Sequence, residues 1–150
     1  MPATKIRTAL RTTGLVWDEF FKAATDMSAA CALYKWVQPG SVFGEVALAT
    51  GASLGAPLGV LQNNPPAGCI ARVRVMGKSI TVASMNACSL LPGTWVAVGS
   101  AAQSFPTTCG IANARWAGSI TSSASGASWG GYGEVYLLGP SFNACIAGAS

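Results

Sequence analysis

The stretch "CIARVRVMGKSITVA" (Cys69–Ala83) carries the clearest strand pattern in the chain. Apolar residues at 71, 73 and 75 alternate with Arg72 and Arg74, so one face is apolar and the other is charged. A period of two is expected of a strand that is buried on one face only. Gly77-Lys78 then has the composition of a tight hairpin turn, with a second strand over Ser79–Ala83. The stretch therefore predicts an antiparallel hairpin.

Short apolar runs continue on both sides of this hairpin and are separated by turns rich in Gly and Pro. The runs cover residues 32–37, 42–49, 57–62, 94–98, 111–118 and 133–139. About eight short runs at this spacing are typical of an antiparallel sandwich or a small barrel. No repeat of fixed period is evident among them. The small-residue stretch rich in Gly, Ser and Trp at 118–133 is expected to be a loop.

The first thirty residues have a different pattern. Their apolar residues include Trp17, Phe20, Phe21, Ala24 and Met27. This is the spacing of one helical face, and Thr13 is a suitable N-cap for it. We therefore expect an extended arm over residues 1–13 followed by a short helix. The predicted organisation is an arm and helix over 1–30 and a single β-domain over 31–150.

Charged residues are scarce. The 150 residues include 9 Lys+Arg and 5 Asp+Glu, so 9% are charged, whereas about 25% is usual for soluble domains. Hydrophobic residues make up 51% and the mean hydropathy is +0.43. A free monomer would have few charges with which to cover its surface. Large apolar surfaces usually mark contacts with partners, so the composition predicts a structural protein that packs against other subunits.

Catalytic chemistry has little support in the sequence. The chain has no His, which excludes Ser-His and Cys-His pairs and most metal centres. Its five cysteines, Cys31, Cys69, Cys88, Cys109 and Cys145, contain no CxxC pair and are expected to be reduced, buried thiols. We therefore predict no enzyme activity, no catalytic residues, no metal and no cofactor.

Nucleic acid and membrane are also unlikely partners from the sequence. Arg72, Arg74 and Lys78 form only a short basic stripe, which the solvated face of one hairpin explains. The apolar stretch from Val42 to Gln62 is interrupted by Gly and Pro, so a membrane-spanning helix is not expected there. The sequence predicts neither direct nucleic-acid binding nor membrane insertion.

Eight residues are candidates for contacts with other subunits or with a larger assembly. They are Lys5, Arg7, Arg11, Trp17, Phe20, Phe21, Trp129 and Tyr132. The basic residues belong to the expected arm. The aromatic ones suit interface anchors, because aromatic side chains are enriched at hot spots, but core packing of their own domain explains them equally well.

The segment "GSVFGEVALATGASLGAPLGVLQNNPPAGCIARVRVMGKSITVA" (Gly40–Ala83) resembles the capsid decoration (cement) proteins of tailed bacteriophages and related small phage head proteins. The matching positions are Pro57, Gly59, Val60, Leu61, Gln62, Asn63, Pro65, Ala67, Gly68, Val73, Val75 and Gly77. The closing "GEVYLLGPS" (Gly133–Ser141) is similar to the last strand of such proteins. The expected fold class is therefore mainly β, a small antiparallel β-tulip-like sandwich or barrel with one short N-terminal helix and an extended arm.

The resemblance implies a homotrimer made in the host cytoplasm and seated on the outer surface of the capsid in the virion. Its partner would be the major capsid protein, whose neighbouring subunits it would clamp in the expanded head against internal DNA pressure. Two alternatives remain open. One is another virion component, such as a head fibre or tail protein, and the other is a carbohydrate-binding surface domain that uses the loop at 118–133.

Overall fold

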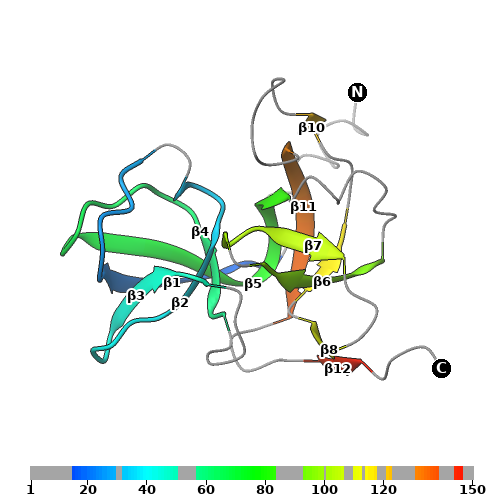
Figure 1. Ribbon diagram of the computed structural model, residues 1–150, viewed down its shortest axis with the longest axis horizontal. Coiled ribbons are helices and arrows are strands. Elements are labelled where there is room, and N and C mark those ends of the chain that lie inside the picture. Colours follow the sequence, from blue (N-terminus) through cyan, green and yellow to red (C-terminus); the bar gives the residue numbers. More distant parts are fainter. Residues whose placement is uncertain are drawn as a thin grey trace.

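The computed structural model describes residues 15–29, 32–50, 57–83, 93–99, 101–106, 110–112, 114–117, 121–122, 131–138 and 144–146. Within these ranges the chain forms twelve strands and no α-helix (Figure 1). The prediction of a mainly β chain is thus confirmed. The predicted arm lies outside the described residues, and so do Lys5, Arg7, Arg11 and Trp129. No described helix is long and apolar enough to cross a membrane.

Ten of the strands form one mixed sheet, and two short ones form a separate pair. The strands are β1 (Trp17–Ala23), β2 (Trp36–Pro39), β3 (Glu45–Leu48), β4 (Gly59–Leu61), β5 (Ile70–Ala83), β6 (Trp95–Val98), β7 (Ser104–Pro106), β8 (Gly110–Ala112), β9 (Ala114–Trp116), β10 (Thr121–Ser122), β11 (Gly131–Leu138) and β12 (Ala144–Ile146). Two pairings, β1 with β3 and β5 with β7, are parallel. The expectation of a purely antiparallel sheet is therefore wrong.

The predicted hairpin at Gly77-Lys78 does not form. Instead β5 runs unbroken through Gly77, and its partner β11 keeps one register from Leu138, opposite Met76, to Gly131, opposite Ala83. Gly77 has a φ of +96°, which glycine tolerates readily, and the backbone of Leu15 lies against it where a Cβ would stand. The glycine therefore serves a close approach of two backbones rather than a chain reversal.

The long strand β5 is shared by two closed circuits of hydrogen-bonded strands. The N-terminal circuit runs β1–β3–β2–β4–β5 and returns to β1, and the C-terminal circuit runs β5–β7–β6–β9–β11 and returns to β5. Figure 1 shows β1–β4 on one side of β5 and β6, β7 and β11 on the other. Closing a sheet on itself satisfies the edge strands, which otherwise expose unpaired backbone groups.

The two circuits repeat one topology. In each, the first and third strands are parallel and the other four pairings are antiparallel. Trp36 opposite Val60 in β2 and β4 corresponds to Trp95 opposite Arg115 in β6 and β9. The chain therefore contains an internal structural duplication, although its sequence shows no evident repeat of fixed period.

Backbone hydrogen bonds outside the strands repeat as well. The Tyr34 N–H donates to the Leu61 carbonyl at 3.0 Å, and the Gly93 N–H donates to the Trp116 carbonyl at 2.7 Å. Both Tyr34 and Gly93 have a positive φ, +63° and +92°, immediately before the corresponding strands. Such agreement between local conformations supports the strand-by-strand correspondence.

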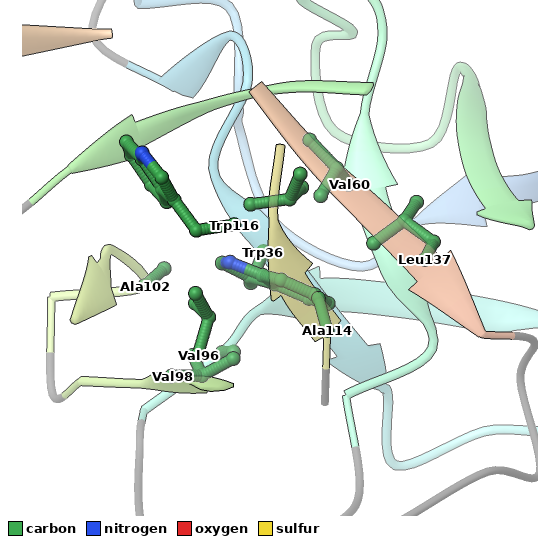
Figure 2. Close-up of a cluster of buried hydrophobic side chains, with 10 residues drawn as sticks. Trp36, Val60, Val96, Val98, Ala102, Ala114, Trp116 and Leu137 are labelled. Carbon is green, nitrogen blue, oxygen red and sulfur yellow. The ribbon is translucent and has the colours of Figure 1, made fainter. Parts of the chain in front are cut away.

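Each circuit has its own hydrophobic core, and the two cores use residues at equivalent positions of the duplicated strands. Val37, Leu61, Val73 and Val75 belong to the core of the N-terminal circuit. Their counterparts Val96, Trp116, Val135 and Leu137 belong to the other core. Figure 2 shows the second core, which also receives Trp36 and Val60 from the N-terminal circuit. These two side chains bind the circuits together.

The helix predicted from Trp17 is wrong, because Trp17–Ala23 is strand β1. β1 pairs with β5 from Trp17 opposite Met76 to Lys22 opposite Ile70. Phe20 and Lys22 face outward, whereas Phe21 packs against the core and Ala23 is buried. Aromatic residues favour strands once a partner strand is present, and this tertiary pairing overrides the helical spacing.

Candidate interaction surfaces

An ion-pair cluster lies on the outer face of the N-terminal circuit. The Asp18 carboxylate in β1 accepts from Arg74 at 2.8 Å (Nε to Oδ1) and lies 3.0 Å from Arg72 (Nε to Oδ2). Arg74 also donates to the Lys78 carbonyl at 3.2 Å. The side chains of Asp18 and Arg74 are about four-fifths buried, so this contact joins β1 to β5 in a fixed geometry.

Two further ion pairs are more open to solvent. Lys22 lies 3.1 Å from Glu45, and Lys78 lies 2.7 Å from Glu134. The lysine of each pair is substantially exposed, so each is expected to contribute only about 0–1 kcal/mol. The basic residues at 72, 74 and 78 thus pair with carboxylates of the same domain, and Arg74 is largely buried rather than solvated.

The structure separates the aromatic residues that the sequence nominated. Trp17 and Phe20 are 49% and 66% exposed, so they are available to a partner. Phe21 packs against the N-terminal core instead. The Tyr132 ring meets the Tyr34 ring edge-on with centroids 5.9 Å apart, and this contact joins the two circuits. Only Trp17 and Phe20 of these four thus present large apolar area to the outside.

Among the described residues, seven exposed large apolar residues were missed by the sequence interpretation: Leu15, Val16, Val42, Phe43, Ile70, Ile80 and Tyr136. Val42 and Phe43 lie at the turn between β2 and β3, and Phe43 is fully exposed. The turn composition, with Gly40, Ser41 and Gly44 around a Val-Phe pair, was the available signal. The two side chains form a small exposed apolar patch at the tip of the hairpin, where a partner could reach it.

A second feature missed by the sequence lies at the far end of the C-terminal circuit. The Arg115 guanidinium lies 4.0 Å from the centre of the Trp95 ring, which is a cation–π contact. Arg115 is exposed and Trp95 is half-buried. The two residues are neighbours on β9 and β6 but far apart in the sequence, and for this reason their spacing gave no signal.

The segment at 118–133 is only partly a loop. It includes β10 and the first residues of β11, which pair with each other at Thr121 opposite Tyr132. Trp116, beside this segment, is 1% exposed and belongs to the C-terminal core, where its Nε1 has no hydrogen-bond partner among the described residues. Trp116 is therefore unable to serve as a platform for a sugar ring.

Cys69 is exposed, so the expectation of a buried thiol is wrong for this residue. Within the described ranges no three His, Cys, Asp or Glu side chains gather as a metal site would require. Asp26 has a pKa below its usual value because its carboxylate accepts hydrogen bonds from Ser28, including the backbone N–H at 2.9 Å.

The double-circuit architecture has a counterpart among solved structures. The crystal structure of the head fibre gp8.5 N base of bacteriophage phi29 superposes with a TM-score of 0.55. The match covers 82% of this chain and 94% of that one, at 12% sequence identity. The fold of this chain is thus similar to that of the phi29 head fibre base. No family model matches the sequence, and no curated protein matches it either.

The extent of the match indicates which part of the fold is shared. Each circuit occupies less than half of the chain, so a match over 82% includes strands of both. The likeness therefore extends over both circuits of this chain and not over one of them alone. At 12% identity the likeness concerns the fold, and it assigns no residue a role.

Proposed function

We propose that this chain is a structural protein of a bacteriophage virion that attaches to the head. The observation that carries the proposal is the shared fold over most of both chains with the base of a phage head fibre. The low charge and the exposed Trp17, Phe20 and Phe43 support a protein that works in contact with other subunits. It acts by binding, and we propose no catalytic activity for it.

In this proposal the protein is a homotrimer on the outer surface of the capsid, and its partner is the major capsid protein. A trimer that binds several capsid subunits at once gains from multivalency, so modest single contacts add up to firm attachment. If it binds the expanded shell better than the procapsid, it stabilises the expanded state by linkage. A decoration protein would use this gain to clamp neighbouring subunits against the pressure of packaged DNA.

A head-fibre base fits the fold as well as a decoration protein does. Both roles require the same attachment, but only the decoration role requires that attachment strengthens the shell. Heads with and without the protein should therefore be heated while DNA release is followed with a dye. A higher release temperature in its presence indicates a decoration protein, and an unchanged one indicates a fibre base.

Attachment itself is tested by sedimentation. Purified chain is mixed with expanded phage heads that lack it, and in parallel with procapsids, and the heads are pelleted. We expect stoichiometric, saturable recovery with expanded heads and weaker recovery with procapsids. Recovery that stays at background with both shells over a range of salt concentrations would contradict the proposal.

The carbohydrate-binding alternative uses a loop at 118–133 that lies mostly outside the described residues. Trp116, which precedes this loop, is buried among core side chains. A glycan array followed by a tryptophan-fluorescence titration remains the direct test of this alternative.

A further inference from the structure

The junction between the two circuits shows how one unit docks on the next. The turn between β6 and β7 sits against Trp36 of the N-terminal circuit, whose backbone N–H donates to the Ala102 carbonyl at 2.9 Å. The indole Nε1 of Trp36 donates to the Ser104 hydroxyl at 2.7 Å. Trp36 and Ala102 are almost completely buried. The tryptophan face of one unit thus receives the hairpin turn of the following unit.

The duplication gives each half of this junction a counterpart elsewhere in the molecule. Trp95 with Arg115 corresponds to Trp36 with Val60 as a cross-strand pair. The β2–β3 turn corresponds to the β6–β7 turn, and Gly44 takes the place of Ala102.

The two turns share their backbone design. Gly44 and Ala102 both have a positive φ, +82° and +58°. The Gly40 N–H donates to the Glu45 carbonyl and the Gly99 N–H to the Gln103 carbonyl, both at 2.8 Å. The β2–β3 turn is one residue longer, but both turns present the carbonyl of a positive-φ residue shortly before the next strand, so a face that accepts one carbonyl is suited to accept the other.

Both counterparts are open. At the junction Trp36 and Val60 are at most 2% exposed, whereas Trp95 is half-buried under an exposed Arg115. The β2–β3 turn carries Val42 and a fully exposed Phe43, where the β6–β7 turn carries Ala101 beside the buried Ala102. Among the described residues, the Trp95 face is therefore covered only in part, by Arg115, and the more apolar β2–β3 turn is exposed.

We propose that a second copy of this chain fills that face, with its β2–β3 turn docked on Trp95 and Arg115 as the β6–β7 turn docks on Trp36. The contact continues the interface that already joins the two circuits. Phe43 takes the position of Ala101, which is exposed at the junction, but its longer side chain would reach the indole and the guanidinium as aromatic and cation–π partners. The Gly44 carbonyl would take the role of the Ala102 carbonyl toward the Trp95 N–H.

This contact is head-to-tail, since it joins different surfaces of two identical chains. A head-to-tail contact produces a ring when its rotation closes, and a filament when it does not. Three copies would close into a ring of six similar units. The inference rests on the proposed homotrimer for the number of copies, but the contact does not depend on a phage head.

A polar cap is the simpler explanation of Arg115, because terminal units of repeat proteins often carry a polar outer face. That explanation leaves Phe43 without a reason, since a terminal turn would not gain from a fully exposed phenylalanine. Complementary docking of the two open ends accounts for both residues at once.

The test measures the molar mass of the purified full-length chain by light scattering during size exclusion. We expect a trimer for the wild type and a monomer for either Phe43→Asp or Arg115→Asp. Ile70→Asp, a change at a residue that is 66% exposed and outside both ends, is the matched control and should stay trimeric. Thermal melts followed by circular dichroism confirm that every variant is folded.

Mixing the two defective variants separates this contact from a symmetric one. The Phe43→Asp chain keeps an intact tryptophan face and the Arg115→Asp chain keeps an intact turn, so an equimolar mixture should form a dimer and stop there. A wild-type monomer, or a Phe43→Asp chain that remains trimeric, would overturn the inference. The sedimentation assay with heads is scored separately, so loss of this contact and loss of head attachment are distinguishable.

Discussion

The Trp116 indole occupies the space in which a side chain on Gly133 would stand. A Cβ built on Gly133 collides with the ring atoms Cζ2 and Cη2 of Trp116. In the N-terminal circuit the corresponding residues are Ala71 and Leu61, both in the core. A larger residue on one strand is thus matched by a smaller one on another, as close packing requires.

This relationship predicts that Gly133→Ala destabilises the protein. Overpacking a filled core costs about 1–3 kcal/mol, so a lower melting temperature is expected. The double variant Gly133→Ala/Trp116→Leu recreates the pair of the other circuit and should recover part of the loss relative to Trp116→Leu alone. Additive effects of the two changes in urea denaturation would argue against the correspondence between the circuits.

Trp36→Phe is expected to weaken the junction between the circuits. The change removes the donor of the 2.7 Å hydrogen bond to Ser104, whose hydroxyl also lies 2.8 Å from that of Thr81. Ser104 keeps the Thr81 hydroxyl as a partner, so the expected cost is that of one lost hydrogen bond, about 0.5–1.5 kcal/mol. Trp95→Phe changes the corresponding, half-buried position and serves as the control, with a smaller loss of unfolding free energy expected for the monomer. Equal losses of unfolding free energy for the two variants would show that Trp36 contributes no more to stability than Trp95 does.

Asp18→Asn should destabilise the pairing of β1 with β5. The substitution leaves Arg72 and Arg74 without their shared carboxylate, and a partly buried charged contact is worth more than an exposed one. We expect a loss of about 1–2 kcal/mol, against at most about 0.5 kcal/mol for Glu134→Gln, which breaks only the exposed pair with Lys78. Denaturation at two ionic strengths checks this, because the exposed pair should be the more sensitive to salt.

Gly77→Ala tests the close approach at the middle of β5. An alanine there meets both an unfavourable φ of +96° and the backbone of Leu15. Gly68→Ala is the matched control, because Gly68 has a similar φ of +80° but a Cβ on it meets nothing nearer than 4.0 Å. The control measures conformational strain alone, about 1 kcal/mol, and Gly77→Ala should lose clearly more. Equal losses would remove the steric part of the explanation.

The sequence predicted the strand content well where one face is buried. The alternation at 71–75 correctly placed Val73 and Val75 in a core, with Arg72 and Arg74 outside. It failed at Trp17–Ala23, where two adjacent phenylalanines give a helical spacing that only the partner strand β5 overrides. It also failed at Gly77, because residue type alone does not distinguish a glycine that permits a close approach of two backbones from one that permits a turn.

The duplication was the largest feature that the sequence interpretation missed. Its trace is short: "WVQPGS" from Trp36 and "WVAVGS" from Trp95 share the pattern Trp-Val-x-x-Gly-Ser. Elsewhere corresponding positions keep burial rather than identity, as with Leu61 and Trp116 or Ala71 and Gly133. Residue letters alone do not reveal a repeat that is conserved in backbone hydrogen bonds and core position. The correspondence of the exposed surfaces at Phe43 and Trp95 to the buried junction could be recognised only after the structure showed the duplication.

Electron microscopy of phage heads incubated with this chain examines attachment most directly. We predict additional density on the outside of expanded heads, at sites of threefold symmetry, into which three copies of the two-circuit fold can be placed. Heads that look identical with and without a saturating amount of folded chain would contradict the account.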